Sequence, residues 1–164
     1  MAAGGRGTTR FLVDAMLGSL ARKLRAFGFD STYHGRGSDA GILSDISRQG
    51  RVLVTADRQL AARAWKLGLS SLLVTGESDR ARLATMMRAA GDVGLRLKRG
   101  EPRCSLCNSK LDRITMSKAR GRVPGSVARR HRVFRECPNC GQLYWKGGHW
   151  KQLRRLEALL NPRS

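Results

Sequence analysis

The chain alternates short apolar runs with longer segments in which apolar residues recur every three or four positions. The run Phe11-Leu12-Val13 predicts a buried strand, and the segment after it predicts an amphipathic helix whose apolar face runs from Leu17 to Leu24. The same change of period recurs three times, with strands expected over 31–34, 52–55 and 71–75 and helices expected over 38–50, 60–67 and 83–90. Strands that alternate with helices are typical of parallel βαβ units. The pattern therefore predicts an α/β domain with a mainly parallel sheet.

A domain boundary is expected from Gly91 to Pro102, where the pattern dissolves into Gly, Lys and Arg. We expect three parts: a loose tail over 1–10, the first domain over 11–100, and a small module with a C-terminal helix over 101–164. The tail has no apolar segment typical of a signal peptide, and no run approaches the eighteen or so apolar residues of a membrane span. These features predict a cytoplasmic protein.

The charge of the chain points to a polyanionic partner. There are 32 Lys and Arg against 12 Asp and Glu, which gives a formal net charge of +20. A membrane surface is the rival to nucleic acid, but no basic amphipathic helix carries a broad aromatic or Leu face. The charge is densest in the small module, where residues 118–132 form a predicted basic loop. Nucleic-acid contacts are expected at Arg129, Arg130, Arg132, Lys146, His149 and Trp150.

Aromatic residues gather close to the end of the module. Tyr144, Trp145 and Trp150 lie among Lys146, His149 and Lys151. Rings interleaved with cations can stack on unpaired bases while the cations bind phosphates. Alternatively, the same rings form the small core of the module and its contact with the first domain. For His149, a surface position or a helix start is the structural alternative.

Four cysteines occur as two pairs, Cys104-x-x-Cys107 and Cys137-x-x-Cys140, with 29 residues between the pairs. Two such pairs can close tetrahedrally around one ion, so the spacing predicts a structural Zn²⁺ site. Gly141 supports this prediction, because a glycine after the second cysteine lets the backbone turn its amides toward the sulfur. Iron in a rubredoxin-like site and thiols without a metal, including a redox dithiol, are the alternatives.

Three carboxylates are expected at one edge of the predicted sheet. Asp14, Asp39 and Asp57 each follow a strand or begin a helix, and the carboxyl ends of parallel strands meet at the same edge. Clustered carboxylates repel each other unless divalent cations neutralise them, so we predict a catalytic Mg²⁺ or Mn²⁺ site acting on phosphodiesters. Structural roles are the alternative, since Asp57 is a good N-cap and Asp39 complements a helix dipole. Asp45 and Asp79 are secondary candidates.

Four motifs carry a resemblance to a known family. FLVDAMLGSLARKLRAFGFD, LVTADRQLA, CSLCNSKL and CPNCGQLYWKGGHW together resemble the Mut-seven C-terminal RNase domain family, over about residues 11–150. In that family a PIN-like nuclease domain precedes a zinc ribbon. The resemblance implies a three-layer α/β/α first domain and a metal-dependent ribonuclease with RNA as its partner. It also implies that Asp14 and Asp57 belong to the acidic site and that the four cysteines bind zinc.

The chain departs from the family pattern at the start of the second predicted helix. Members usually carry a run of acidic residues there, whereas the segment 38–41 offers only Asp39. A thinner acidic cluster keeps a second hypothesis open, namely an RNA-binding or ribosome-associated module with weak or no catalytic activity.

Overall fold

The first domain is built on a four-stranded parallel sheet. The structure, a computed structural model, describes residues 8–34 and 37–160, without the side chains of 148–150. The strands are β1 (Arg10–Asp14), β2 (Asp30–His34), β3 (Val52–Thr55) and β4 (Ser71–Leu73). Their order in the sheet is β2-β1-β3-β4, and all neighbours pair in parallel. After β1 the chain forms β2 on one side of β1, and β3 then pairs with the other side of β1. The topological switch point therefore lies between β1 and β3.

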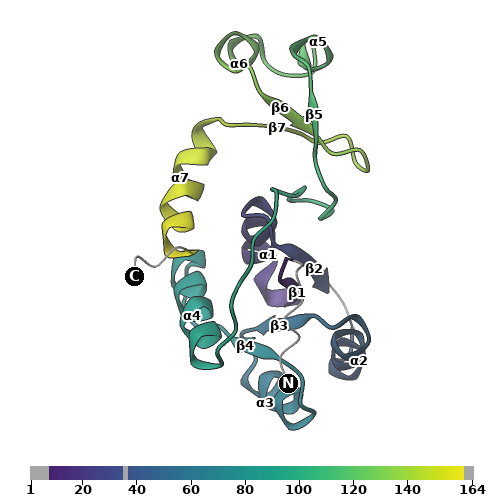
Figure 1. Ribbon diagram of the computed structural model, residues 1–164, viewed down its shortest axis with the longest axis vertical. Coiled ribbons are helices and arrows are strands. Elements are labelled where there is room, and N and C mark those ends of the chain that lie inside the picture. The colour runs from purple at the N-terminus through teal and green to yellow at the C-terminus, as the bar shows by residue number, and fades with distance from the viewer. Residues whose placement is uncertain (1–7, 35–36, 161–164) are drawn as a thin grey trace.

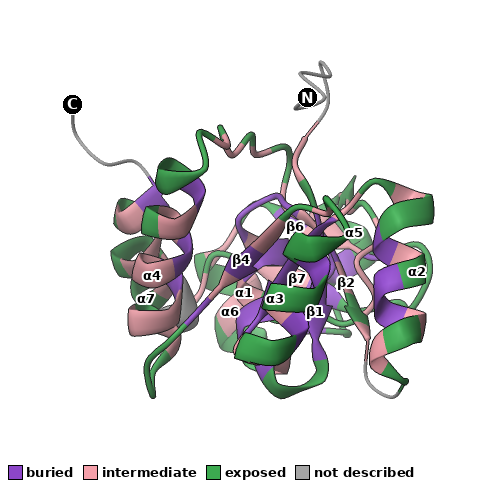
Figure 2. Cartoon of the chain, turned by 90° about the horizontal axis from the view of Figure 1, so that it is seen from below, coloured by how far each residue is buried: buried purple, intermediate pink, exposed green. Residues whose placement is uncertain are grey.

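Helices cover both faces of this sheet, as predicted for a three-layer α/β/α domain. They are α1 (Gly18–Ala26), α2 (Asp39–Gln49), α3 (Arg58–Lys66) and α4 (Asp79–Asp92), with a short 3₁₀ helix, η1 (Ala15–Leu17), before α1. One buried cluster joins α1 and α4 to the sheet, and a second joins α2 and α3 to its other face. Figure 2 shows the buried strands between α4 on one side and α2 on the other.

Alternate residues of the central strands serve the two faces. In β1, Phe11 and Val13 pack with α1 and α4, whereas Leu12 packs with α2 and α3. Burial on both sides explains why the strand is a continuous apolar run. Each such side chain contributes about 1.5–3 kcal/mol on burial. The apolar runs are therefore the strongest predictors of this sheet.

The small module is a zinc ribbon by its fold, with a three-stranded antiparallel sheet and the cysteines at one end. Its strands are β5 (Asp112–Ile114), β6 (Phe134–Glu136) and β7 (Leu143–Trp145), in the order β5-β6-β7. The prediction of a loop over 118–132 is wrong, because α5 (Met116–Ala119) and α6 (Gly125–Arg130) occupy much of this segment. Ala119 and Val123 are buried against Phe134, so sparse small apolar residues order a stretch dominated by arginine.

The C-terminal helix returns to the first domain. It comprises α7 (Gly148–Glu157) and the 3₁₀ helix η2 (Ala158–Leu160). Leu160 belongs to the cluster of α1 and α4, and Leu153, Leu156 and Leu159 pack against that cluster. Figure 1 shows the end of α7 beside α4. None of the helices in the described part of the chain is both long and apolar enough to cross a membrane.

The segment between the domains is bonded to the start of the chain. The backbone N–H of Thr9 donates to the carbonyl of Lys98 at 2.9 Å, and the N–H of Lys98 donates to Thr9 Oγ1 at 2.9 Å. Of the tail expected over 1–10, residues 1–7 lie outside the described residues, while Thr9 and Arg10 take part in the fold. The segment after α4 is thus held along the first domain before the ribbon begins.

Candidate active site and metal centre

Asp14 lies at the switch point of the sheet, at the carboxyl end of β1. Val13 pairs with Val54, so the next positions, Asp14 and Thr55, are neighbours across β1 and β3. Thr55 Oγ1 donates a hydrogen bond to Asp14 Oδ2 at 2.8 Å, and the residues are 0% and 8% exposed, respectively. No Lys, Arg or His of the described chain forms an ion pair with Asp14. A nearly buried carboxylate without a cationic partner is costly, and a bound cation would offset that cost.

Asp57 caps α3 and is tied to the same threonine. Its Oδ1 accepts hydrogen bonds from the backbone N–H groups of Gln59 at 2.7 Å and Leu60 at 3.1 Å. Its own N–H donates to Thr55 Oγ1 at 3.0 Å, so one hydroxyl links the backbone of Asp57 to the carboxylate of Asp14. The structural role considered for Asp57 is therefore present. Because both capping bonds use the same oxygen, capping is compatible with a second ligand.

Asp39 lies in the first turn of α2, after the N-cap Ser38. Its carboxylate forms an ion pair with Arg63 of α3. Asp45, a secondary candidate, accepts a hydrogen bond from Arg48 at 2.7 Å and lies 3.8 Å from His34 Nδ1. Among the described residues, only the four cysteines form a group of three or more potential ligands close enough to hold one ion. The three predicted aspartates lie on one edge of the domain, but their carboxylates are not close enough together to form such a group.

A second polar cluster lies where α1 and α4 begin. Ser19 Oγ donates to Asp79 Oδ2 at 2.6 Å, and Lys23 pairs with the same oxygen. Burial raises the pKa of Asp79, but the hydrogen bonds from Lys23 and Ser19 outweigh it and hold the pKa below its usual value. Asp79 was a secondary candidate from its position after the fourth strand. Nothing in the sequence indicated that Ser19 and Lys23 would contact Asp79, beyond their place on the first helix.

The four cysteines converge as predicted. Cys104 Sγ lies 3.5 Å from Cys140 Sγ, Cys107 Sγ lies 3.3 Å from Cys137 Sγ, and all four sulfurs lie within 4.8 Å of one another. A tetrahedral site with Zn–S bonds of about 2.3 Å has sulfurs about 3.8 Å apart. The arrangement fits such an ion, so the cysteines could bind zinc. Iron has the same ligand preference and stays an alternative.

The two cysteine pairs have matching backbone turns. The N–H of Asn108 donates to Cys104 O at 2.9 Å, and the N–H of Gly141 donates to Cys137 O at 2.9 Å. Asn108 and Gly141 have φ values of 68° and 71°, a conformation that Gly and Asn adopt most readily. A hydrogen bond with the Ser109 side chain lowers the pKa of Cys107 to about 5, which favours the thiolate that binds metals.

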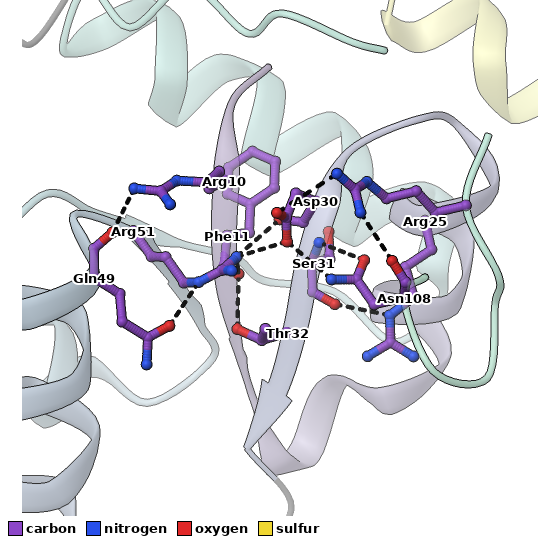
Figure 3. A network of polar contacts seen from close by, with 10 residues as sticks. Arg10, Phe11, Arg25, Asp30, Ser31, Thr32, Gln49, Arg51 and Asn108 are labelled. Atoms are coloured by element: carbon purple, nitrogen blue, oxygen red, sulfur yellow. Dashed lines mark hydrogen bonds and ion pairs between the residues drawn. The ribbon is translucent and has the colours of Figure 1, made fainter. Parts of the chain in front are cut away.

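Arg25 connects the first cysteine turn to the sheet domain through hydrogen bonds (Figure 3). Its Nε donates to Ser31 O at 2.7 Å within β2. Its Nη1 donates to Ser105 O at 2.8 Å and to Leu106 O at 3.0 Å, inside the first cysteine pair. The residue is 6% exposed. One buried guanidinium thus joins α1, β2 and the cysteine turn.

Asp30 and Asn108 add a second connection (Figure 3). Asn108 Nδ2 donates to Asp30 Oδ1 at 2.8 Å, and the N–H of Ser31 donates to Asn108 Oδ1 at 3.0 Å. Arg51 pairs with Asp30 at 2.8 Å, and Arg103 lies 3.6 Å from it. Burial raises the pKa of Asp30, but the bonds from Arg51 and Asn108 outweigh it and lower the pKa. We call these contacts of Arg25, Asp30 and Asn108 the ribbon junction.

The predicted nucleic-acid contacts are spread over the ribbon and the start of α7. Four of them are exposed: Arg129, Arg130, Arg132 and Lys146. The other two, His149 and Trp150, lie in the first turn of α7, and their side chains lie outside the described residues. The hydroxyl of Tyr144 accepts from the N–H of Ser105 at 3.0 Å, and Trp145 packs against the ribbon core. These contacts favour the structural alternative for the two β7 rings.

A comparison with known families matches residues 9–156 to the Mut7-C RNAse domain. The comparisons with curated proteins and with solved structures found no match. The matched span includes the parallel sheet, the sheet edge with Asp14 and both cysteine pairs, and it confirms the resemblance noted from the motifs. The family description indicates a nuclease-type function. The match extends over most of the chain, which therefore belongs to the Mut7-C RNase domain family.

Proposed function

We propose that the chain is a metal-dependent ribonuclease that cleaves RNA phosphodiester bonds at the carboxyl edge of the sheet, beside Asp14. The observation that carries the proposal is the nearly buried Asp14 carboxylate at the switch point, with Thr55 beside it and no cationic partner in the described chain. A divalent cation is the natural compensation for such a carboxylate. Membership of an RNase family supports the same reaction class.

In this proposal Asp14 and Asp57 would hold Mg²⁺ or Mn²⁺. Such an ion stabilises charge on the scissile phosphate and supplies a nucleophile at neutral pH. Thr55 positions both residues, since its hydroxyl donates to one carboxylate and accepts from the backbone of the other residue. Asp39 would join them on release from Arg63, its partner across α2 and α3.

The ribbon would hold the RNA, and zinc would be its structural ion. The net charge of +20 supports a polyanionic partner. The proposed RNA contacts are the six ribbon residues predicted above: Arg129, Arg130, Arg132, Lys146, His149 and Trp150. We place the reaction in the cytoplasm, where cysteine thiols stay reduced and available to a metal.

A second function has a specific observation in its favour. Asp57 caps α3 and Asp39 is paired with Arg63, so two of the three carboxylates already have structural partners. An RNA-binding or ribosome-associated module with weak or no catalysis would keep these partners. Both functions include RNA binding, and only the ribonuclease also cleaves the RNA.

The test is RNA cleavage by the purified chain in Mg²⁺ and in Mn²⁺. Asp14→Asn and Asp57→Asn should each lower the cleavage rate at least a hundredfold, which corresponds to about 2.7 kcal/mol of transition-state stabilisation. Because Asn caps a helix about as well as Asp, the melting temperature of Asp57→Asn should stay close to that of the wild type. Asp92→Asn is the matched control, since that carboxylate is exposed at the far end of α4.

Each result separates the two functions. Cleavage at the wild-type rate by both variants would remove these carboxylates from the mechanism. A wild-type chain that binds RNA and cleaves none with either metal would establish the binding module instead. Loss of cleavage in Asp92→Asn would show that the variants report on general damage to the fold.

A further inference from the structure

A groove of about 1030 Å³ lies between α1, the ribbon and α7. Arg22 and Lys23 of α1 line one side, and Arg135 of β6 and Lys146 after β7 line the ribbon side. Arg103, which precedes the first cysteine, completes a set of five cations. No carboxylate occurs among the described lining residues. Figure 1 shows the course of α1, β7 and α7, which carry part of this lining.

The cations of the groove differ in how far they are neutralised. Arg135 pairs with Glu101 at 2.9 Å, and the side chain of Glu101 is 81% exposed, so water screens that pair strongly. Arg22, on the opposite wall, is exposed. Lys23 and Arg103 also have carboxylate partners, but none of these carboxylates lines the groove. The lining therefore carries an excess of positive charge, and an anion is the ligand that complements it.

Aromatic residues of β7 lie among these cations. Tyr144 and Trp145 have the structural contacts described above, but both are only half-buried, and they line the groove together with Leu153 and Leu156 of α7. Rings next to cations bind unpaired nucleotides, because bases stack on rings while cations hold the phosphates. A duplex keeps the faces of its bases stacked inside the helix, so it cannot use such rings. The lining thus favours a single strand.

The groove leads toward the acidic edge through α1. Lys23 lines the groove and also pairs with Asp79, at the start of α4. Ser19, one turn earlier on α1, donates to the same carboxylate. Because α1 starts just after the carboxyl end of β1, its first turns connect the groove with the edge that carries Asp14.

We propose that this groove binds a single-stranded segment of RNA and leads it along α1 toward the carboxyl edge of the sheet. The inference rests on the proposed ribonuclease function only in assuming that the bound RNA is cleaved. The binding itself follows from the charge and the rings of the groove. It adds Arg22, Arg103 and Arg135 to the RNA contacts, none of which the sequence pattern singled out.

The test measures binding without cleavage, by fluorescence anisotropy of a labelled single-stranded RNA in buffer without added Mg²⁺ or Mn²⁺. The groove variant carries Arg22→Gln and Arg135→Gln, which keep the aliphatic stems and remove one charge from each wall. The control carries Lys66→Gln and Arg88→Gln, which remove two charges from exposed positions on α3 and α4. Neither control residue lines the groove.

The groove variant should bind at least tenfold more weakly at 150 mM salt. The slope of log K against log salt should fall by about 1.4, since each phosphate contact on a single strand contributes about 0.7. The control should stay within twofold of the wild type. Equal affinity of the two double variants would overturn the proposal, and so would a duplex RNA that competes as well as the single strand.

A crosslinking experiment locates the strand independently. RNA containing 4-thiouridine, irradiated with the wild-type chain, should form crosslinks at Tyr144 or Trp145. Crosslinks confined to α3 or α6 would overturn the groove assignment. Both experiments are independent of catalysis, so a chain that fails the cleavage test can still bind RNA in the groove, and the two failures are distinguishable.

Discussion

Replacing Arg25 by methionine isolates the contribution of the ribbon junction to stability. Methionine keeps an unbranched side chain in the space next to α1, and it removes the guanidinium with its three hydrogen bonds. The three acceptors are the backbone carbonyls of Ser31, Ser105 and Leu106, at 2.7, 2.8 and 3.0 Å. These bonds connect the sheet domain with the first cysteine turn.

The magnitude follows from the burial of the donor and of its acceptors. Hydrogen bonds from a charged group contribute about 1.5–3 kcal/mol each, before the cost of burying the charge. That cost is real here, because burial lowers the pKa of Arg25. Ser105 is half-buried and Leu106 is exposed, so water can reach the carbonyls of the cysteine turn in the variant. Ser31 is fully buried, and its carbonyl would lose its partner. We expect a loss of about 2–4 kcal/mol in the free energy of unfolding.

Urea denaturation, followed by tryptophan fluorescence and far-ultraviolet circular dichroism, measures this loss. Arg22→Met is the matched control, because Arg22 is exposed one turn earlier on the same helix. The control should change the free energy of unfolding by no more than about 0.5 kcal/mol. An Arg25→Met variant within that same margin would refute the reasoning that the junction stabilises the fold.

Three further predictions concern the same region. Because the pKa of Asp30 is lowered in the folded state, its contribution to stability is present above the unfolded pKa of about 4 and is lost as the pH falls through the folded pKa. Asp30→Asn should therefore flatten the loss of stability below about pH 4 in acid titrations followed by circular dichroism. Gly28 has φ +92°, and an added Cβ would collide with the carbonyl oxygen of Gly100. Gly68 has φ +70° and open space around it. Gly28→Ala should therefore lower the melting temperature more than Gly68→Ala. Equal melting temperatures would show that the collision is relieved at no cost. Removal of the proposed zinc ion by a chelator, or Cys137→Ser, should destabilise the sheet domain as well as the ribbon. An unchanged unfolding transition of the sheet domain would contradict this coupling.

The sheet domain was largely predictable because its strands are buried on both sides. Burial on two faces turns β3 into the uninterrupted run 52–55, whose limits the structure reproduces. Helix α3 was also predicted, but Trp65 and Leu67 are 73% and 62% exposed. Periodicity in the sequence identifies a helix, whereas the burial of each apolar residue depends on its neighbours in space. On α3, only Leu60 and Ala64 are buried.

The segment 118–132 shows where composition misleads. Its many arginines predict a solvated loop, yet the apolar residues between them are enough to pack two short helices onto the ribbon core. Ala119 of α5 is buried there, and Val127 and Ala128 of α6 are half-buried. Thr115 Oγ1 accepts from the N–H of Lys118 at 3.4 Å and caps the first of them. Tertiary burial against Phe134 decides the structure, and nothing in the local sequence encodes that contact.

The candidate site was predictable for residues whose spacing carries the signal. The cysteine pairs are such a case, because two short motifs define four ligands. Thr55 and Arg25 carry no comparable signal. Thr55 meets Asp14 across 41 positions, and Arg25 meets Ser105 across 80, so only the folded chain brings these partners together.

Helix α1 connects the three candidate functional regions of the molecule. Its first turn contacts Asp79, at the start of α4, through Ser19. Arg22 lines the basic groove, and Arg25 is bonded to the first cysteine turn. Because successive turns of one helix are rigidly related, a ribbon fixed at Arg25 is also fixed relative to the edge that carries Asp14. A metal in the ribbon would therefore stabilise more than its own module. In the proposed ribonuclease it would fix the wall of the groove formed by β6 and β7 at a set distance from the carboxylates, and so set the position along a bound strand at which cleavage can occur.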